Sequence, residues 1–151
     1  MKKKWIWLIP CLVVLVAAVI LALLLIPRSV TKMLGIDRLQ AADVEKIEFD
    51  VVYDRGMGWQ TDDSEIIGEV LDALRQIKMT GETEDVTGAG PTIRFTLHLK
   101  AAVNGSKTVS FVLCDGELYS LSEKGKPTYF VSGGYGRAEW TTLLHKCEKT
   151  Y

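Results

Sequence analysis

The fold is decided by residues 92–114, which read TIRFTLHLKAAVNGSKTVSFVLC. In the first half, apolar residues alternate with polar ones, as on a strand with one buried face: Ile93, Phe95, Leu97 and Leu99. Asn104-Gly105 is the pair that a two-residue type I′ turn prefers, because both of its central positions need positive φ. The alternation then resumes at Val109, Phe111 and Leu113. The stretch therefore predicts a long antiparallel hairpin.

Further strands are expected on both sides of this hairpin. Upstream, Ile47, Phe49, Val51 and Tyr53 alternate with polar residues until Gly56-Met57-Gly58, where we expect the strand to break. Downstream, Asp115-Gly116 is a second turn signal. Short apolar segments at 118–121 and 128–131 follow it. Consecutive hairpins of this kind build an antiparallel sheet.

Two amphipathic helices are expected to cover one face of the sheet. In the first, Asp62 and Glu65 have capping-box spacing, and Gly81 is a natural C-terminal stop. Its apolar stripe comprises Ile66, Ile67, Val70, Leu71, Leu74 and Ile77. The second helix, from Arg137 to Cys147, carries Trp140, Leu143, Leu144 and Cys147 on one side. The order β-α-β-β-β-β-α predicts an α+β two-layer sandwich, with a four- to five-stranded antiparallel sheet packed against two helices.

An uncharged apolar run precedes this domain. It covers residues 5–26, and its 22 residues would form a helix of roughly 33 Å, enough to cross a hydrocarbon core of about 30 Å. The three lysines at positions 2–4 favour a cytoplasmic N-terminus. We therefore expect a single-pass signal anchor in the cell membrane, with a cytoplasmic tail at 1–4, a transmembrane helix at 5–26, a stalk at 27–42 and an extracytoplasmic domain at 43–151.

Two processing alternatives compete with an uncleaved anchor. Val16-Ala17-Ala18 has the small residues that a signal peptidase requires, but cleavage there would leave an apolar terminus at Val19–Ile26. Leu8-Ile9-Pro10-Cys11 partly matches a lipoprotein box, although proline stands where a small residue belongs and the apolar run continues after the cysteine. The length of the run favours the spanning helix over both alternatives.

The charge and residue types of the domain restrict its chemistry. Residues 29–151 contain 14 basic and 19 acidic residues, a formal charge of −5, which argues against nucleic acid and against an anionic lipid surface as ligands of the domain. His98 and His145 are its only histidines and no CxxC motif is present, so we expect neither a zinc site nor another cofactor. GxSxG and HExxH motifs are also missing from the sequence, and we therefore expect a protein that is not an enzyme.

The domain contains two cysteines, Cys114 at the end of a predicted strand and Cys147 on the inner side of the last helix. Outside the membrane such a pair can form a disulfide. Two separately buried thiols are the alternative, because free cysteine is among the most buried residue types. The sequence alone leaves both interpretations open.

Three residues are candidates for binding a partner. Trp59 follows a glycine-flanked turn, where an exposed aromatic side chain would be a good anchor for a partner, or would fold back as an apolar lid. Arg94 and His98 alternate onto the polar face of a strand, which is solvated by default. The leading hypothesis is a membrane-tethered domain that binds a protein or an envelope component. An accessory subunit of a membrane complex and a cell-envelope hydrolase with paired carboxylates are the alternatives.

The chain also resembles small uncharacterised membrane-anchored or exported proteins of Gram-positive bacteria that carry a domain of unknown function. The resemblance comprises the lysine-rich start, the single apolar helix, the segment Asp43-Val44-Glu45-Lys46-Ile47-Glu48-Phe49 and the Asp-capped helix. It implies an extracytoplasmic location in a bacterium and no particular activity.

Overall fold

The structure is a computed structural model of the chain, and it describes residues 5–52, 57–83, 92–114, 117–120 and 128–150. The predicted hairpin is confirmed and consists of β4 (Thr92–Val103) and β5 (Ser106–Cys114). Asn104 and Gly105 form its turn with φ values of 52° and 81°. The expected turn at 115–116 lies outside the described residues.

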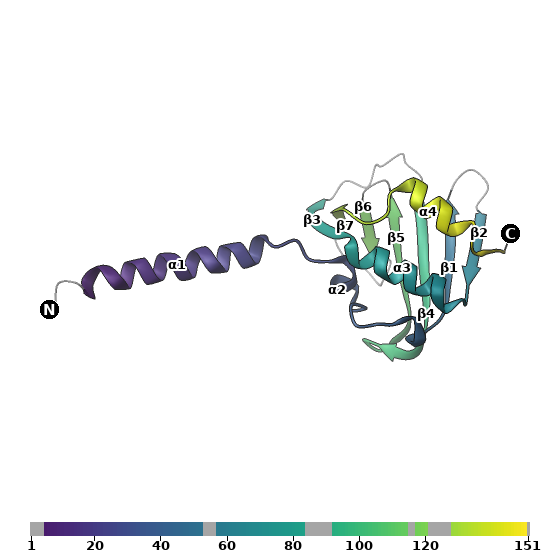
Figure 1. Cartoon of the computed structure of the whole chain (residues 1–151), viewed down its shortest axis with the longest axis horizontal. Helices are drawn as coiled ribbons and strands as arrows, with labels where there is room; N and C mark the ends of the chain where they lie inside the picture. The colour runs from purple at the N-terminus through teal and green to yellow at the C-terminus, as the bar shows by residue number, and fades with distance from the viewer. Residues whose placement is uncertain (1–4, 53–56, 84–91, 115–116, 121–127, 151) are drawn as a thin grey trace.

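One antiparallel sheet forms the centre of the domain (Figure 1). The described residues contribute eight strands to it, in the order β3-β7-β6-β5-β4-β1-β2-β8. The strands not yet given are β1 (Val44–Val52), β2 (Met57–Thr61), β3 (Lys78–Thr83), β6 (Glu117–Ser120), β7 (Thr128–Ser132) and β8 (Glu148–Lys149). The helices are α1 (Trp5–Leu25), α2 (Val30–Leu34), α3 (Ser64–Gln76) and α4 (Arg137–Leu144), with a 3₁₀ turn at Ala41–Asp43. The α+β class with an antiparallel sheet is thus confirmed.

Three strands were not expected. Met57 does not end the first strand but starts β2, which returns beside β1 with Trp59 opposite Phe49. Helix α3 stops at Gln76 rather than near Gly81, because β3 pairs with β7, and Gly81 lies at a register shift in that pairing. Strand β8 has two residues and pairs with β2, too short a segment to show a period in the sequence.

The helix α3 begins one residue later than expected. Its N-cap is Asp63, whose Oδ1 accepts a hydrogen bond of 2.8 Å from the backbone N of Glu65. The Asp63 amide in turn donates to Thr61 Oγ1 at 3.2 Å. Asp62, the expected cap, is exposed beside it.

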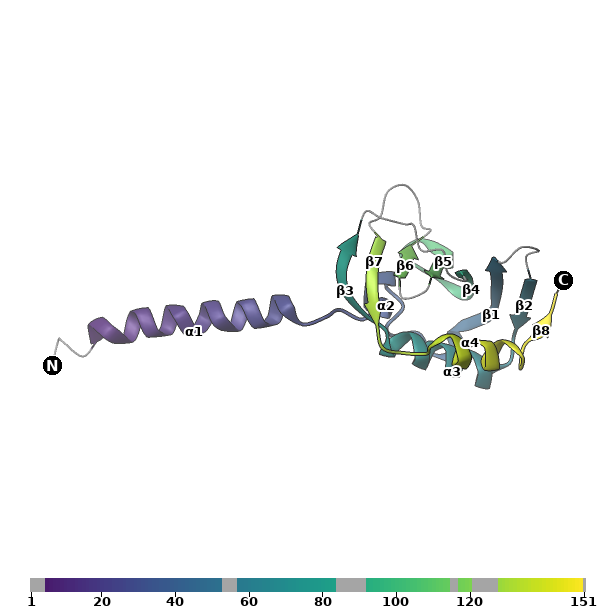
Figure 2. The same cartoon turned by 90° about the horizontal axis from the view of Figure 1, so that it is seen from above.

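Helices α3 and α4 cover the same face of the sheet (Figure 2). On that face Phe95 stacks on Phe111 with ring centroids 4.8 Å apart, and it meets Phe49 edge-on at 5.4 Å. Trp140 of α4 packs on Phe95 from above, at 5.1 Å. The three phenylalanines come from adjacent strands in direct register, so the sheet itself positions the aromatic core.

The expected stalk at 27–42 is wrong, because most of this segment belongs to the domain. Its backbone pairs with the start of β3: Val30 N donates to Ile77 O at 3.0 Å, and Met79 N donates to Arg28 O at 2.8 Å. Its apolar residues join the core, with exposures of 9% or less: Val30, Leu34, Ile36 and Leu39. The physical reason is that α3 leaves one side of the core open, and this segment closes it against α3 and β3.

Helix α1 extends away from the domain, and the apolar side chains of its described part are exposed (Figure 1). Leu24 and Leu25, for example, are 71% and 73% exposed. In the part of the chain that the structure describes, no helix reaches the length and apolar character needed to cross a membrane. The expected N-terminal helix is therefore confirmed, and the membrane span stays a prediction.

The burial of the segment 27–42 leads to the first prediction. In a version of the chain beginning at Arg28, Ile36→Ala should lower the free energy of unfolding by about 2–5 kcal/mol, because it removes a fully buried side chain and leaves a cavity. Asp37→Ala, at the exposed neighbouring position, should change it by less than about 0.5 kcal/mol. Urea unfolding followed by circular dichroism measures both. Equal small effects for the two variants would show that the segment is a stalk after all.

Candidate functional site

The domain contains a cavity of about 570 Å³ between the inner face of the sheet and α4, here called the α4 cavity. This volume lies within the range of sites that bind small molecules, roughly 300–1,000 Å³. Its floor comes from the sheet: Val51, Met57, Trp59, Ile93, Leu113 and Val131. Its roof comes from α4 and the β7–α4 connection: Tyr135, Arg137, Trp140, Thr141, Leu144 and His145. Ile77, Ser132, Gly133 and Gly136 complete the lining.

The cavity exists because α4 is too short to cover the whole inner face. The helix has eight residues, and its buried side chains pack on the centre of the sheet around Phe95. Beyond that centre, Val51, Ile93 and Leu113 stand next to one another across three adjacent strands. All three are only half-buried although they point inward. They form an apolar row that faces the cavity.

The connection between β7 and α4 depends on two glycines. Gly133 and Gly134 have φ values of 78° and 75°, in the left-handed region that favours glycine. A Cβ on Gly134 would lie 2.4 Å from Cγ1 of Ile77. The glycine pair therefore lets the chain pass close to the end of α3 before α4 begins, and this sets the position of the roof.

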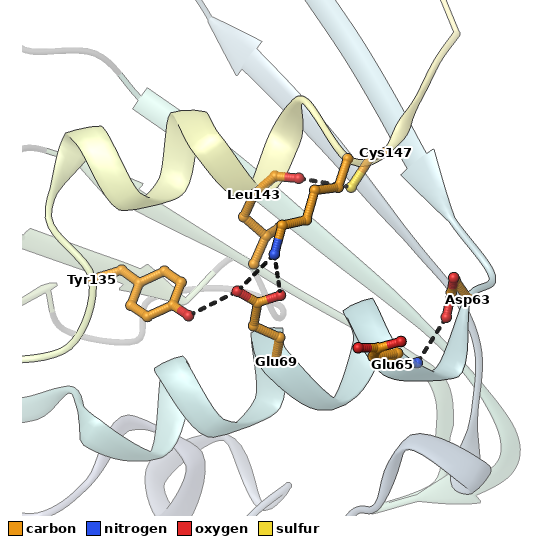
Figure 3. Close-up of polar contacts among 7 residues, drawn as sticks. Asp63, Glu65, Glu69, Tyr135, Leu143 and Cys147 are labelled. Atoms are coloured by element: carbon orange, nitrogen blue, oxygen red, sulfur yellow. Dashed lines mark hydrogen bonds and ion pairs between the residues drawn. The ribbon is translucent and has the colours of Figure 1, made fainter.

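One carboxylate of α3 holds both ends of α4 (Figure 3). Lys146, just after the helix, donates to Glu69 Oε2 at 2.8 Å, and Tyr135, just before it, donates to Glu69 Oε1 at 3.1 Å. The hydrogen bond from Lys146 lowers the pKa of Glu69 and raises the pKa of Lys146. Burial raises the pKa of Tyr135, with the Glu69 hydrogen bond as the second cause. The three side chains fix the distance between α4 and α3.

The polar groups of the α4 cavity are few. Arg137, Thr141 and His145 lie on the exposed side of the roof, and the described lining contains no carboxylate. The buried indole Nε1 of Trp140 has no hydrogen-bond partner among the described residues. A largely apolar lining with a few polar groups suits an apolar or amphipathic ligand more than a highly charged one.

Cys147 lies beside this roof as a free thiol (Figure 3). Its Sγ is 3.5 Å from the carbonyl oxygen of Leu143, and burial raises its pKa to about 11. The side chain of Cys114, at the end of β5, lies outside the described side chains. The Cys114–Cys147 disulfide therefore stays a prediction.

The structure separates the three predicted binding residues. Trp59 lies on the inner face, half-buried against the core, and lines the floor of the α4 cavity. Arg94 and His98 lie on the outer face of β4, where Arg94 is exposed and His98 Nε2 is 3.2 Å from Glu48 Oε2. The hydrogen bond from Lys46 lowers the pKa of Glu48. Burial of the carboxylate is the second-largest effect and acts in the opposite direction. The three candidates thus form no single surface.

Sequence reasoning missed the cavity itself. Inward alternation identified Val51, Ile93 and Leu113 as core residues, but not as residues that the helices leave half-covered. The available signal was the shortness of the last helical pattern relative to the strands beneath it. Among the described residues, no group of three or more His, Cys, Asp and Glu side chains is arranged to hold a metal ion.

No family model, no curated protein and no solved structure matches this chain. The resemblance to exported proteins of Gram-positive bacteria therefore stays a prediction.

The raised pKa of Cys147 leads to the second prediction. At pH 8 its thiolate should be about a hundredfold rarer than that of an unburied cysteine, so iodoacetamide should modify it slowly in the folded protein and faster as the pH approaches about 11. Peptide mass spectrometry follows the modification residue by residue, with urea-unfolded protein as the control. Rapid modification in the folded state would contradict the burial. A Cys147 that reacts only after reduction would show the disulfide with Cys114 instead.

Proposed function

We propose that this chain is a membrane-anchored binding protein. Helix α1 holds it in a cell membrane as a single-pass anchor, and the α+β domain outside the cytoplasm binds an envelope component or part of another protein. The α4 cavity is the observation that carries the binding half of this proposal. No reaction is assigned to the domain, since the described cavity lining offers no pair of carboxylates for the hydrolase alternative.

The anchor is supported by the sequence and by the exposure of α1. The uncharged run from Trp5 to Ile26 has 22 residues and extends one residue beyond the helix α1. An apolar helix with no protein packed on it exposes its side chains to water, which costs free energy in proportion to the apolar area. A bilayer is the environment that removes this cost, and the lysines at 2–4 favour a cytoplasmic N-terminus.

The binding role is supported by the shape and chemistry of the α4 cavity. The half-buried row of Val51, Ile93 and Leu113 offers apolar surface that the fold itself does not cover. The exposed side chains of Arg137, Thr141 and His145 stand at its edge and suit the polar end of an amphipathic ligand. By contrast, Glu48 and His98 lie on the outer sheet face, with Glu48 Oε2 3.2 Å from His98 Nε2.

A cavity-filling substitution gives the third prediction. The chain beginning at Arg28 should bind the apolar fluorophore N-phenyl-1-naphthylamine saturably, with increased emission. Ile93→Trp should weaken this binding at least about tenfold, because the larger side chain occupies the cavity. Arg94→Trp is the matched control, since the next residue of the same strand points to the opposite face, and its affinity should stay within about twofold of the unsubstituted chain.

Urea unfolding of both variants shows whether they remain folded. The proposal fails if the unsubstituted domain shows no saturable binding. It also fails if a folded Ile93→Trp variant binds as tightly as the Arg94→Trp control.

A further inference from the structure

Three basic residues lie at the end of the domain that faces α1: Arg28, Lys32 and Lys78, here called the basic junction. The first two lie close together in the sequence, but Lys78 comes from β3. An antiparallel bridge between Ser29 and Lys78 brings it beside them, and Met79 N donates to Arg28 O at 2.8 Å. Both figures of the whole chain show α2 and β3 at this end (Figures 1 and 2).

The basic junction is exposed and uncompensated. All three side chains are exposed, and none of them has an acidic partner in the part of the chain that the structure describes. The alternation of the backbone explains the exposure of Lys78: Ile77 points into the core at 1% exposure, which turns Lys78 outward. The local charge is therefore positive although residues 29–151 carry a formal charge of −5.

The spacing from α1 limits where this charge can lie. Only Ile26 and Pro27 separate Leu25, the last residue of α1, from Arg28, so the two ends are at most about 11 Å apart. This inference depends on the proposed anchoring, with α1 across the bilayer. The headgroup layer on each side of the hydrocarbon core is roughly 5–7 Å thick. Arg28 then lies in or next to that layer, and its hydrogen bond to Met79 keeps β3 there too.

We propose that the basic junction binds anionic phospholipid headgroups and holds the β3 end of the domain against the bilayer. Basic side chains beside a membrane helix are attracted to anionic lipids, and each one favours the bound position by roughly fivefold. The remaining, acidic part of the domain is repelled from the same surface. The two effects together give the domain one orientation relative to the membrane. The negative net charge of the whole domain argues against contact with anionic lipids. The local charge at the basic junction is positive, so this argument does not apply there.

The test measures the distance between the domain and the membrane surface in the full chain. A fluorophore is attached at Gly81→Cys on β3, where an added Cβ meets no atom within 4 Å, in a background with the three native cysteines replaced by serine. The chain is reconstituted into vesicles of phosphatidylcholine, with or without phosphatidylglycerol, that contain an acceptor dye on a lipid headgroup. Energy transfer should be higher with phosphatidylglycerol and should fall as salt rises from about 0.1 to about 1 M.

The variant Arg28→Gln, Lys32→Gln, Lys78→Gln should lose both dependences. The matched control Lys100→Gln, Lys107→Gln, Lys149→Gln removes the same charge from exposed residues of β4, β5 and β8 and should retain them. The proposal is wrong if energy transfer does not change with phosphatidylglycerol or salt. It is also wrong if energy transfer in the two triple variants depends equally on phosphatidylglycerol and salt. Flotation of the vesicles after a carbonate wash reports the anchoring separately. A chain that floats with the vesicles but shows no lipid-dependent energy transfer contradicts lipid binding by the basic junction and leaves the proposed anchoring intact.

Discussion

The whole domain depends on keeping the aromatic inner face of one antiparallel sheet away from water. Phe49, Phe95 and Phe111 stand in register on three adjacent strands, and their ring contacts bring together the three largest fully buried side chains of the described domain. Helix α3 covers this face with its buried stripe, α4 adds Trp140, and the segment after α1 closes the remaining side with Val30 and Ile36. Each of these elements is amphipathic because each has the same surface to cover.

The candidate site follows from the same constraint, because the cover is incomplete. Glu69 of α3 contacts both ends of helix α4, through Tyr135 and Lys146, and these contacts favour the observed position of the helix beside the row of Val51, Ile93 and Leu113. The α4 cavity is the space left between them. The proposed binding function requires only an apolar floor, a helix positioned above it and polar side chains at the edge of the cavity.

The sequence predicted what local periodicity controls. It predicted the Asn104-Gly105 hairpin, the inward residues of β1 and β4, and the stripe of α3, since each is set by alternation, turn chemistry or capping within a few residues. It missed what only tertiary contacts decide. Lys78–Thr83 forms a strand because β7 and the segment 27–42 lie beside it. Ile36 is buried because α3 leaves one side of the core open. Trp59 was a candidate for its residue type, but its face follows from pairing with Phe49.

The central claim is that α1 anchors this domain on the outer side of a cell membrane, and protease shaving of intact protoplasts tests it most directly. The chain would carry an epitope tag after Tyr151, next to β8 at the edge of the sheet. External protease should remove the tag while a cytoplasmic marker protein stays whole. A tag that survives until the protoplasts are lysed, and is then cleaved, would place the domain in the cytoplasm and contradict the account.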